Sequence, residues 1–157
     1  MALRMYCATL APTAITVAAD LFELTPAANK AILIHGFRVF QTSDVGDAQD
    51  EVIGLSWVRG NATTGSGGNA AAAPVKKDSY SPTAGSTFES ANTTAASAGT
   101  AVTTYSTGWN VRAPLEVTFT PEQRIRVDST DVLCCLRMLA APADSLTIGA
   151  SVDYEEI

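Results

Sequence analysis

Apolar and polar residues alternate with a period of two along most of the chain, and no segment sustains the spacing of an amphipathic helix. Such alternation is typical of β-strands that bury one face. Gly, Pro, Asn and Asp separate the alternating segments, as expected for turns. The segments predicted as strands are 3–10, 14–17, 21–24, 30–41, 51–59, 87–93, 101–107, 115–120, 124–128, 131–140 and 145–155, with a short edge strand opening at 74–75.

The strongest predicted strand, 30–41, carries apolar residues on both faces. Its two expected faces hold Ile32, Ile34 and Phe40 on one side and Leu33, Phe37 and Val39 on the other. A strand that is apolar on both sides belongs in the centre of a sandwich or beneath a partner subunit. In 51–59, Ile53, Leu55 and Trp57 are expected to share one face.

The last two predicted strands have the pattern of a core. The side chains expected to point inward are Val132, Cys134, Leu136 and Met138 in 131–140, and Leu146, Ile148, Ala150, Val152 and Tyr154 in 145–155. The turn residues 142–144 lie between the two strands, so a hairpin is predicted there.

Roughly eight to ten strands with long connections predict an all-β fold, an antiparallel two-sheet sandwich of the jelly-roll type. The chain has 157 residues, which suits one β-sandwich domain over 1–157. Its connections are unusual. Between Asn61 and Asn110 the ionisable residues are Lys76, Lys77, Asp78 and Glu89, and most others are Ala, Thr, Ser or Gly. Long small-residue loops on a rigid framework, with 60–73 the most loop-like, favour contact with other proteins.

Charge excludes some classes of partner. The net charge is −6 and the basic residues are scattered, so nucleic-acid binding, which needs clustered Lys and Arg, is not expected. No segment approaches the ~18 consecutive apolar residues of a membrane span, and the N-terminus lacks the apolar run of a signal peptide. Cys7, Cys134 and Cys135 are expected to be free thiols, since adjacent strand residues point to opposite faces. Free thiols suggest synthesis in a reducing cytoplasm.

Candidate catalytic chemistry is sparse, and we predict no enzyme, no cofactor and no metal. His35 is the single histidine, which excludes a cluster of histidine ligands, and its mid-strand position next to Leu33 and Phe37 does not favour a catalytic triad. The acidic loop 44–51 could offer oxygen ligands to calcium, but its spacing does not match an EF-hand. A solvated loop is the favoured interpretation there, and calcium binding is the alternative.

Two tryptophans bear on a carbohydrate-binding alternative. Trp57 alternates with Ile53 and Leu55 and is expected in the core. Trp109 stands near a predicted loop after Tyr105, where either core packing or an exposed stacking platform for a sugar fits the pattern.

Several segments, in order, resemble small structural proteins of tailed bacteriophages and prophages. They are DLFELTPA at 20–27, QTSDVGDA at 41–48, Arg59-Gly60 followed by TGSGG at 64–68, NVRAPL at 110–115, APADS at 141–145 and the closing YEEI at 154–157. These pieces span most of the chain.

The resemblance implies a virion component, foremost a head decoration (cement) protein on the capsid exterior. Proteins of this kind commonly form homotrimers, bind the major capsid protein or another virion protein, and assemble in the bacterial host cytoplasm. Subunit contacts would then use 30–41. The residues expected at capsid or subunit contacts are Ala2, Leu3, Arg4, Met5, Tyr6, Arg59, Asn61, Thr64, Ser66 and Asn69. The alternatives are a carbohydrate-binding or host-recognition module and a tail or head-fibre component.

Overall fold

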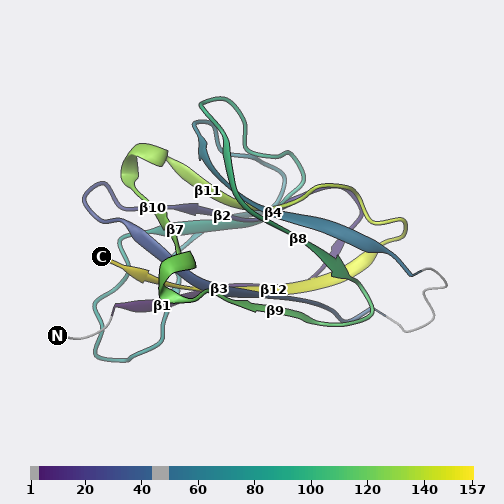
Figure 1. Cartoon of the computed structure of the whole chain (residues 1–157), viewed down its shortest axis with the longest axis horizontal. Coiled ribbons are helices and arrows are strands. Elements are labelled where there is room, and N and C mark those ends of the chain that lie inside the picture. The colour runs from purple at the N-terminus through teal and green to yellow at the C-terminus, as the bar shows by residue number, and fades with distance from the viewer. Residues whose placement is uncertain (1–3, 44–49) are drawn as a thin grey trace.

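The computed structural model of the chain describes residues 4–43 and 50–157. Two antiparallel sheets pack face to face (Figure 1), which confirms the predicted all-β sandwich. The strands are β1 (Met5–Ile15), β2 (Asp20–Thr25), β3 (Ile32–Gln41), β4 (Val52–Asn61), β5 (Asn69–Ala72), β6 (Val75–Lys76), β7 (Thr87–Asn92), β8 (Val102–Asn110), β9 (Leu115–Thr118), β10 (Ile125–Val127), β11 (Leu133–Met138) and β12 (Leu146–Glu156). Short 3₁₀ helices occupy Pro121–Gln123 and Ser129–Asp131.

The strand order has the nested pairing of a jelly roll. Sheet A runs β10-β3-β12-β1-β6, with β9 also paired to β3, and sheet B runs β5-β7-β2-β11-β4-β8. Early strands pair with late ones in a nested series, in which β1 pairs with β12, β2 with β11, β3 with β9 and β10, and β4 with β8. Successive pairs alternate between the sheets, so the chain wraps around one core, as in a jelly roll.

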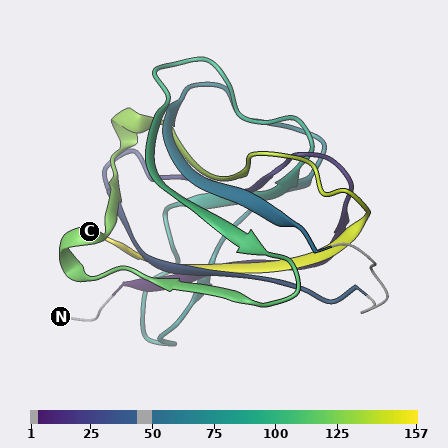
Figure 2. The ribbon, with the colours of Figure 1, turned by 45° about the vertical axis from the view of Figure 1, so that its right-hand side comes forward.

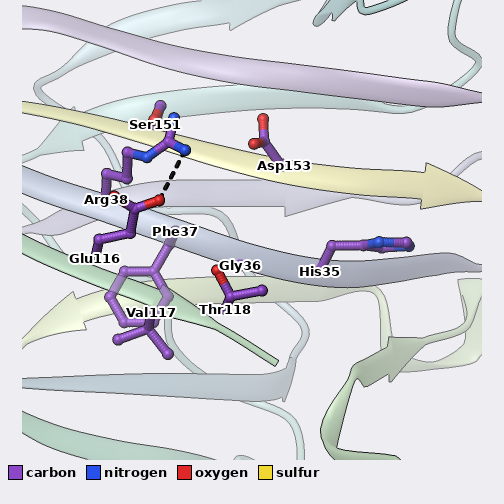
Figure 3. A pocket seen from close by; sticks show the side chains of 9 residues that line it. All are labelled: His35, Gly36, Phe37, Arg38, Glu116, Val117, Thr118, Ser151 and Asp153. Carbon is purple, nitrogen blue, oxygen red and sulfur yellow. Dashed lines mark hydrogen bonds and ion pairs between the residues drawn. The ribbon is translucent and has the colours of Figure 1, made fainter. Parts of the chain in front are cut away.

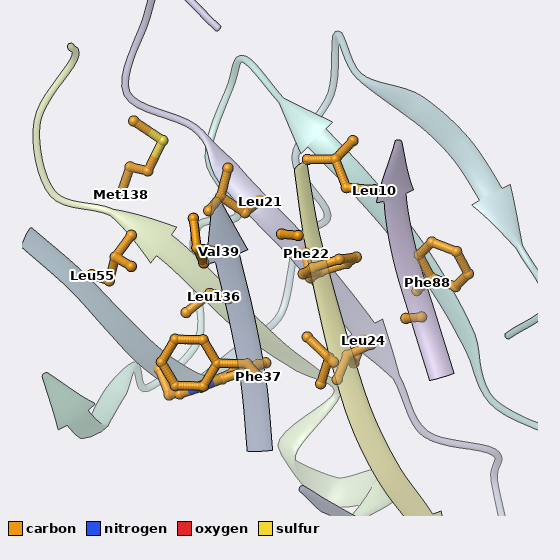
Figure 4. Packing of buried hydrophobic residues seen from close by; sticks show 14 of the residues in the cluster. Leu10, Leu21, Phe22, Leu24, Phe37, Val39, Leu55, Phe88, Leu136 and Met138 are labelled. Atoms are coloured by element: carbon orange, nitrogen blue, oxygen red, sulfur yellow. The ribbon is translucent and has the colours of Figure 1, made fainter. Parts of the chain in front are cut away.

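The core lies between the two sheets and is filled by the inward side chains of both. Figure 4 shows Phe37 and Val39 of sheet A among Phe22, Leu55 and Leu136 of sheet B. The predicted inward residues of the last strand and the trio Ile53, Leu55 and Trp57 are all buried, so the alternation identified these faces correctly. Burial of this apolar surface supplies the main driving force for folding.

The face assignment in 30–41 is wrong, because a β-bulge interrupts the strand. Pairing with β12 jumps from Gly36 opposite Asp153 to Ile34 opposite Tyr154, which leaves His35 as the extra residue. The bulge reverses the alternation, so Ile34 and Phe37 both enter the core and His35 lies on the outer face of sheet A. The predicted central position of the strand is confirmed, since β12 flanks one side of β3 and β9 and β10 flank the other.

The predicted hairpin between the last two strands is also wrong. β11 belongs to sheet B and β12 to sheet A, so residues 139–145 carry the chain from one sheet to the other. Val132, expected to point into the core, precedes β11 with a φ of 61° and is 42% exposed. The 3₁₀ turn before it is closed by reciprocal Asp128 and Asp131 bonds, so the strand begins at Leu133, two residues later than predicted.

Three other segments differ from the predicted boundaries. Residues 14–17 were expected to continue the extended chain after the strand 3–10; β1 does continue across Pro12, with a register shift between Leu10 and Thr13, but it spans Met5–Ile15. Residues 69–72 of the predicted 60–73 loop form β5, which pairs with β7. The edge strand expected at 74–75 is β6, which pairs with the start of β1 and is blunted by Lys76.

Candidate functional site

Two uncharged segments, residues 62–68 and 93–99, lie together on the face of sheet B that is turned away from sheet A (Figure 1). We call them the covering loops. They pair through two isolated bridges, Thr63 with Ser97 and Ser66 with Thr94, whose reciprocal backbone hydrogen bonds are 2.9–3.0 Å long. The loops therefore share a short ladder of their own.

A buried carboxylate holds the first covering loop against the sheet. Glu23 alternates with Phe22 and Leu24, so its side chain points away from the core while those two point into it. The backbone N–H of Gly65 donates to both Glu23 carboxylate oxygens at 3.0 Å. A Cβ at position 65 would lie 2.2 Å from the carbonyl oxygen of Thr94, so only glycine allows this approach.

A buried ion pair holds the second covering loop. Arg137 donates from Nε and Nη2 to the two oxygens of Asp20, at 2.6 and 2.9 Å. The same two residues bind the loop backbone, because the Ala96 N–H donates to Asp20 at 2.7 Å and Arg137 donates to the Ala96 carbonyl at 2.8 Å. Ala96 also packs on Leu133 and Cys135 in a small apolar cluster outside the main core. Both loops are thus fixed at their inner sides.

The same residues do not suit a metal ion. One potential ligand atom each from Asp20, Glu23 and Cys135 lies within 4.8 Å of the other two. However, both Asp20 oxygens already accept hydrogen bonds from Arg137. Burial raises the pKa of the Cys135 thiol strongly, which disfavours the thiolate that a metal requires. Burial raises the pKa of Glu23 as well, because it penalises the charged carboxylate. Asp20 and Glu23 instead anchor the covering loops through their hydrogen bonds.

A third buried carboxylate, Glu156, ties residues 78–86 to sheet A. Glu156 accepts hydrogen bonds from the Ser86 backbone N–H at 2.8 Å and hydroxyl at 2.7 Å, and from Lys30 at 3.1 Å. Burial alone would raise the pKa of Glu156, but the bonds from Ser86 and Lys30 outweigh it and hold the pKa below its usual value. This network also fixes a loop.

The covering loops themselves, and the chain on either side of them, carry no charged residue. Asn61–Val75 and Ser90–Val111 contain no Asp, Glu, Lys or Arg, although the chain carries a net charge of −6. Between them these stretches supply both covering loops and the strands β5 and β8. A rigid, neutral surface of this kind can lie close against another backbone at low desolvation cost.

The residues expected at contacts fall into two groups. Arg59, Asn61, Thr64, Ser66 and Asn69 lie in β4, the first covering loop and β5, and Thr64 and Ser66 are exposed. Their roles differ, since Asn61 is buried while Arg59 pairs with Asp131 at 2.6 Å.

The second group lies at the N-terminal end of sheet A. Arg4 is exposed and Met5 is half-buried. Tyr6 is fully buried and its hydroxyl donates to the Pro82 carbonyl at 3.1 Å, so its side chain serves the protein's own core. Ala2 and Leu3 lie outside the described residues.

Sequence reasoning missed the second covering loop and the anchors Asp20, Glu23 and Arg137. One signal was present, because Glu23 and Arg137 interrupt otherwise apolar strands in LFEL and LCCLRML. A charged residue at such a position is rarely buried without a partner, and the partner here lies far away in the sequence.

The outer face of sheet A carries a small hollow beside the bulge in β3. Figure 3 shows Arg38 and Glu116 joined across it at 2.8 Å, with His35 and Asp153 further along. Its volume of about 80 Å³ is well below that of a typical small-molecule site. Burial, with Arg124 nearby, lowers the pKa of His35, whose Nε2 lies 3.4 Å from Glu155. The lowered pKa favours the neutral imidazole.

The two tryptophans both belong to the core. Trp57 and Trp109 are 0% and 1% exposed, and the Trp109 indole N–H donates to the Ala113 carbonyl at 2.8 Å. Trp109 thus offers no free face for a sugar. Tyr105 is partly buried and packs edge-on against Phe119, with ring centroids 5.1 Å apart.

The remaining sequence expectations concern thiols, calcium and membranes. Cys7, Cys134 and Cys135 are free thiols, as predicted. Residues 44–49 of the acidic loop lie outside the described residues. In the remainder of the loop, Asp50 pairs with Arg112 and Glu51 accepts a hydrogen bond from the Ala143 N–H. In the described ranges no helix has the length and apolar character needed to cross a membrane. No protein-family model, curated protein or solved structure matches the chain.

Proposed function

We propose that this chain is a non-enzymatic structural protein of a bacteriophage virion, a decoration protein that binds the exterior of the head and stabilises its lattice. Its partner is the major capsid protein or another virion protein, and it acts as a homotrimer. Two observations support the proposal. Several segments of the sequence resemble segments of phage structural proteins in the same order, and the folded chain has one property that suits a binding surface.

That property is the anchoring of the covering loops. Buried charges hold both loops on sheet B, through Glu23 for the first and the Asp20–Arg137 pair for the second. A surface that is ordered before binding loses little conformational entropy when it meets its partner. Many copies, each making a modest contact, would then stabilise a lattice through multivalency.

The first test is binding to heads. Purified protein is mixed with heads that lack it, and the bound copies are counted after co-sedimentation. Thr64→Lys places a charge on the exposed first covering loop without touching Gly65, so we expect it to bind heads more weakly. Deleting the loop would be a poorer test, because it also removes the N–H donor on which the Glu23 carboxylate depends.

Thr83→Lys is the matched control, since Thr83 is an exposed threonine in the loop that Ser86 and Glu156 anchor on sheet A. If the two variants bind heads in equal copy number, the covering loops do not form the contact with the head. Binding to isolated tails but not to heads would move the protein to the tail, and no binding to either would overturn the virion role. A monomeric mass in solution and on heads would contradict the trimer.

A further inference from the structure

One side of the sandwich is open between the two sheets. β8 ends sheet B, where it pairs with β4, and no strand in the described ranges pairs with its other side. β9 runs along the same side of sheet A (Figure 2). A groove of about 500 Å³ lies between them, lined by Thr104, Tyr105, Val117, Thr118, Phe119 and Gln123. This volume falls within the usual range for binding sites.

The free edge of β8 carries no charge and no proline to prevent pairing with another strand. Natural edge strands are short, or carry lysine, proline or bulges that prevent pairing. The opposite edge of sheet A follows this rule, since β6 has two residues and includes Lys76. In contrast, β8 has nine residues without a charge or a proline, and its one protecting feature is a bulge at Thr104, the extra residue between Thr103 opposite Val58 and Tyr105 opposite Trp57. Its outward backbone groups can therefore pair with an added strand.

The groove beside this edge is uncharged, with an aromatic floor and with Thr104, Thr118 and Gln123 as polar neighbours. Its floor is the edge-on pair of Tyr105 and Phe119, and Phe37 lies behind Tyr105 at 6.1 Å between ring centroids. None of the residues that line the groove is charged. A charged side chain placed there would lose water without gaining a partner. An added strand would direct every second side chain into this groove.

We propose that β8 is the docking edge for an extended, uncharged peptide segment of a partner protein, which adds to sheet B as a strand and inserts alternate apolar side chains into the groove. A second copy of the chain fits less well. The core-facing side chains of its own β8, Tyr105 and Trp109, already pack in its core and cannot fill the groove of a neighbour. This peptide site is independent of the virion role, because it depends on the edge of sheet B alone.

The test uses the full chain and defined peptides of nine residues, the length of β8. Each peptide has Thr at odd positions, one of Ala, Val, Leu, Phe or Tyr at even positions, and a soluble dye-labelled tail. Binding is followed by fluorescence anisotropy. We expect at least one peptide to bind, and its affinity to fall by about tenfold or more when a central Pro removes a backbone donor or Glu replaces the apolar residues.

The matched protein variants are Thr104→Lys, which places a charge beside the groove, and Thr9→Lys, which changes an exposed threonine of β1. Loss of binding in the first alone supports the site. Failure of every peptide to bind, or equal binding by both variants, overturns it. A concentration-dependent dimer in sedimentation that Thr104→Lys abolishes would assign the groove to a second copy and also overturn the proposal. Head binding is measured separately, so either proposal can fail alone.

Discussion

The buried pair of Asp20 and Arg137 is the most consequential polar contact on sheet B. The Asp20 side chain is 0% exposed, and without Arg137 its carboxylate would be left uncompensated. We expect Arg137→Met to lower the free energy of unfolding by about 3–5 kcal/mol, because it leaves the buried charge of Asp20 without its cationic partner. Urea unfolding measures this loss.

Two further variants separate the buried charge from ordinary side-chain loss. Arg126→Met breaks an exposed pair with Asp128 and is expected to change stability little. Asp20→Leu combined with Arg137→Met removes both charges and is expected to recover part of the loss. Equal effects of Arg137→Met and Arg126→Met would show that the anchor contributes nothing beyond a surface pair.

Glu23 gives the protein a specific dependence on pH. Its pKa is raised by burial, so above the ordinary pKa of a carboxyl group the folded state holds the proton more tightly than the unfolded state. The contribution of Glu23 to stability is therefore full at low pH and falls as pH rises through the folded pKa. Glu23→Gln keeps an acceptor for Gly65 and removes this loss.

We expect the stability of Glu23→Gln relative to the natural protein to be more favourable at neutral pH than at pH 4. Urea unfolding of both proteins at the two pH values measures the difference. Titrating groups that do not interact with Glu23, such as Glu156, occur in both proteins and cancel. A relative stability that is the same at both pH values would contradict the role assigned to Glu23.

Among the elements, the first covering loop depends on a single glycine. A Cβ at position 65 would lie 2.2 Å from the Thr94 carbonyl oxygen and 2.3 Å from a Glu23 oxygen, so Gly65→Ala must lift the loop. We expect a loss of about 1–3 kcal/mol in unfolding free energy, as for other overpacked sites. We also expect faster cleavage within 62–68 by a nonspecific protease, read out by mass spectrometry.

Gly108→Ala is the control for this element. Its Cβ would meet only Cγ1 of Val52, at 2.9 Å, and that exposed side chain can turn away. If both alanine variants are cleaved alike, the covering loop is not held by the close approach at Gly65.

For the molecule as a whole, the nested pairing brings the two ends of the sequence together. Met5 of β1 lies opposite Glu155 of β12, so this pair forms only after the chain closes its longest loop. A permutant that joins residue 157 to residue 1 by a short flexible linker and opens the chain between Ser79 and Tyr80 turns the pair into a hairpin. Tyr80 is 94% exposed, so the cut falls in a surface turn.

We expect this permutant to refold faster than the natural order of strands, because pairing between distant segments slows folding. Stopped-flow refolding from urea measures both rates. An unchanged rate, with stability preserved, would mean that β1 and β12 pair after the rate-limiting step.

Local pattern was sufficient for the positions of most strands and for the inward faces of several. Period-two alternation identified Ile53, Leu55 and Trp57, and likewise the inward residues of β12, because each depends on its immediate neighbours in the strand. It failed at His35, where one extra residue reverses the faces of β3. Gly36 beside it is a local signal, since an isolated glycine in a strand often marks a bulge, but which residue is left unpaired appears only against the partner strand β12.

The candidate site was accessible to sequence reasoning only in part. The lack of charge in 61–75 and 90–111 is visible in the amino-acid order and indicated a contact surface. That these stretches are held down was not visible, because Glu23 is 42 positions from Gly65 and Arg137 is 117 positions from Asp20. The same limit explains why β11 and β12 were paired with each other, although each has its partners in a different sheet.

The amino-acid order alone is enough to specify an all-β chain with a neutral, small-residue exterior, since hydrophobic alternation and charge content are properties of neighbouring residues. Which strands become neighbours, where β3 bulges, which carboxylates are buried with a partner and where the groove beside β8 opens are set by contacts between residues far apart in the chain. Such contacts are selected by the packing of the whole sandwich, because burial of one face and satisfaction of every buried charge must be achieved together.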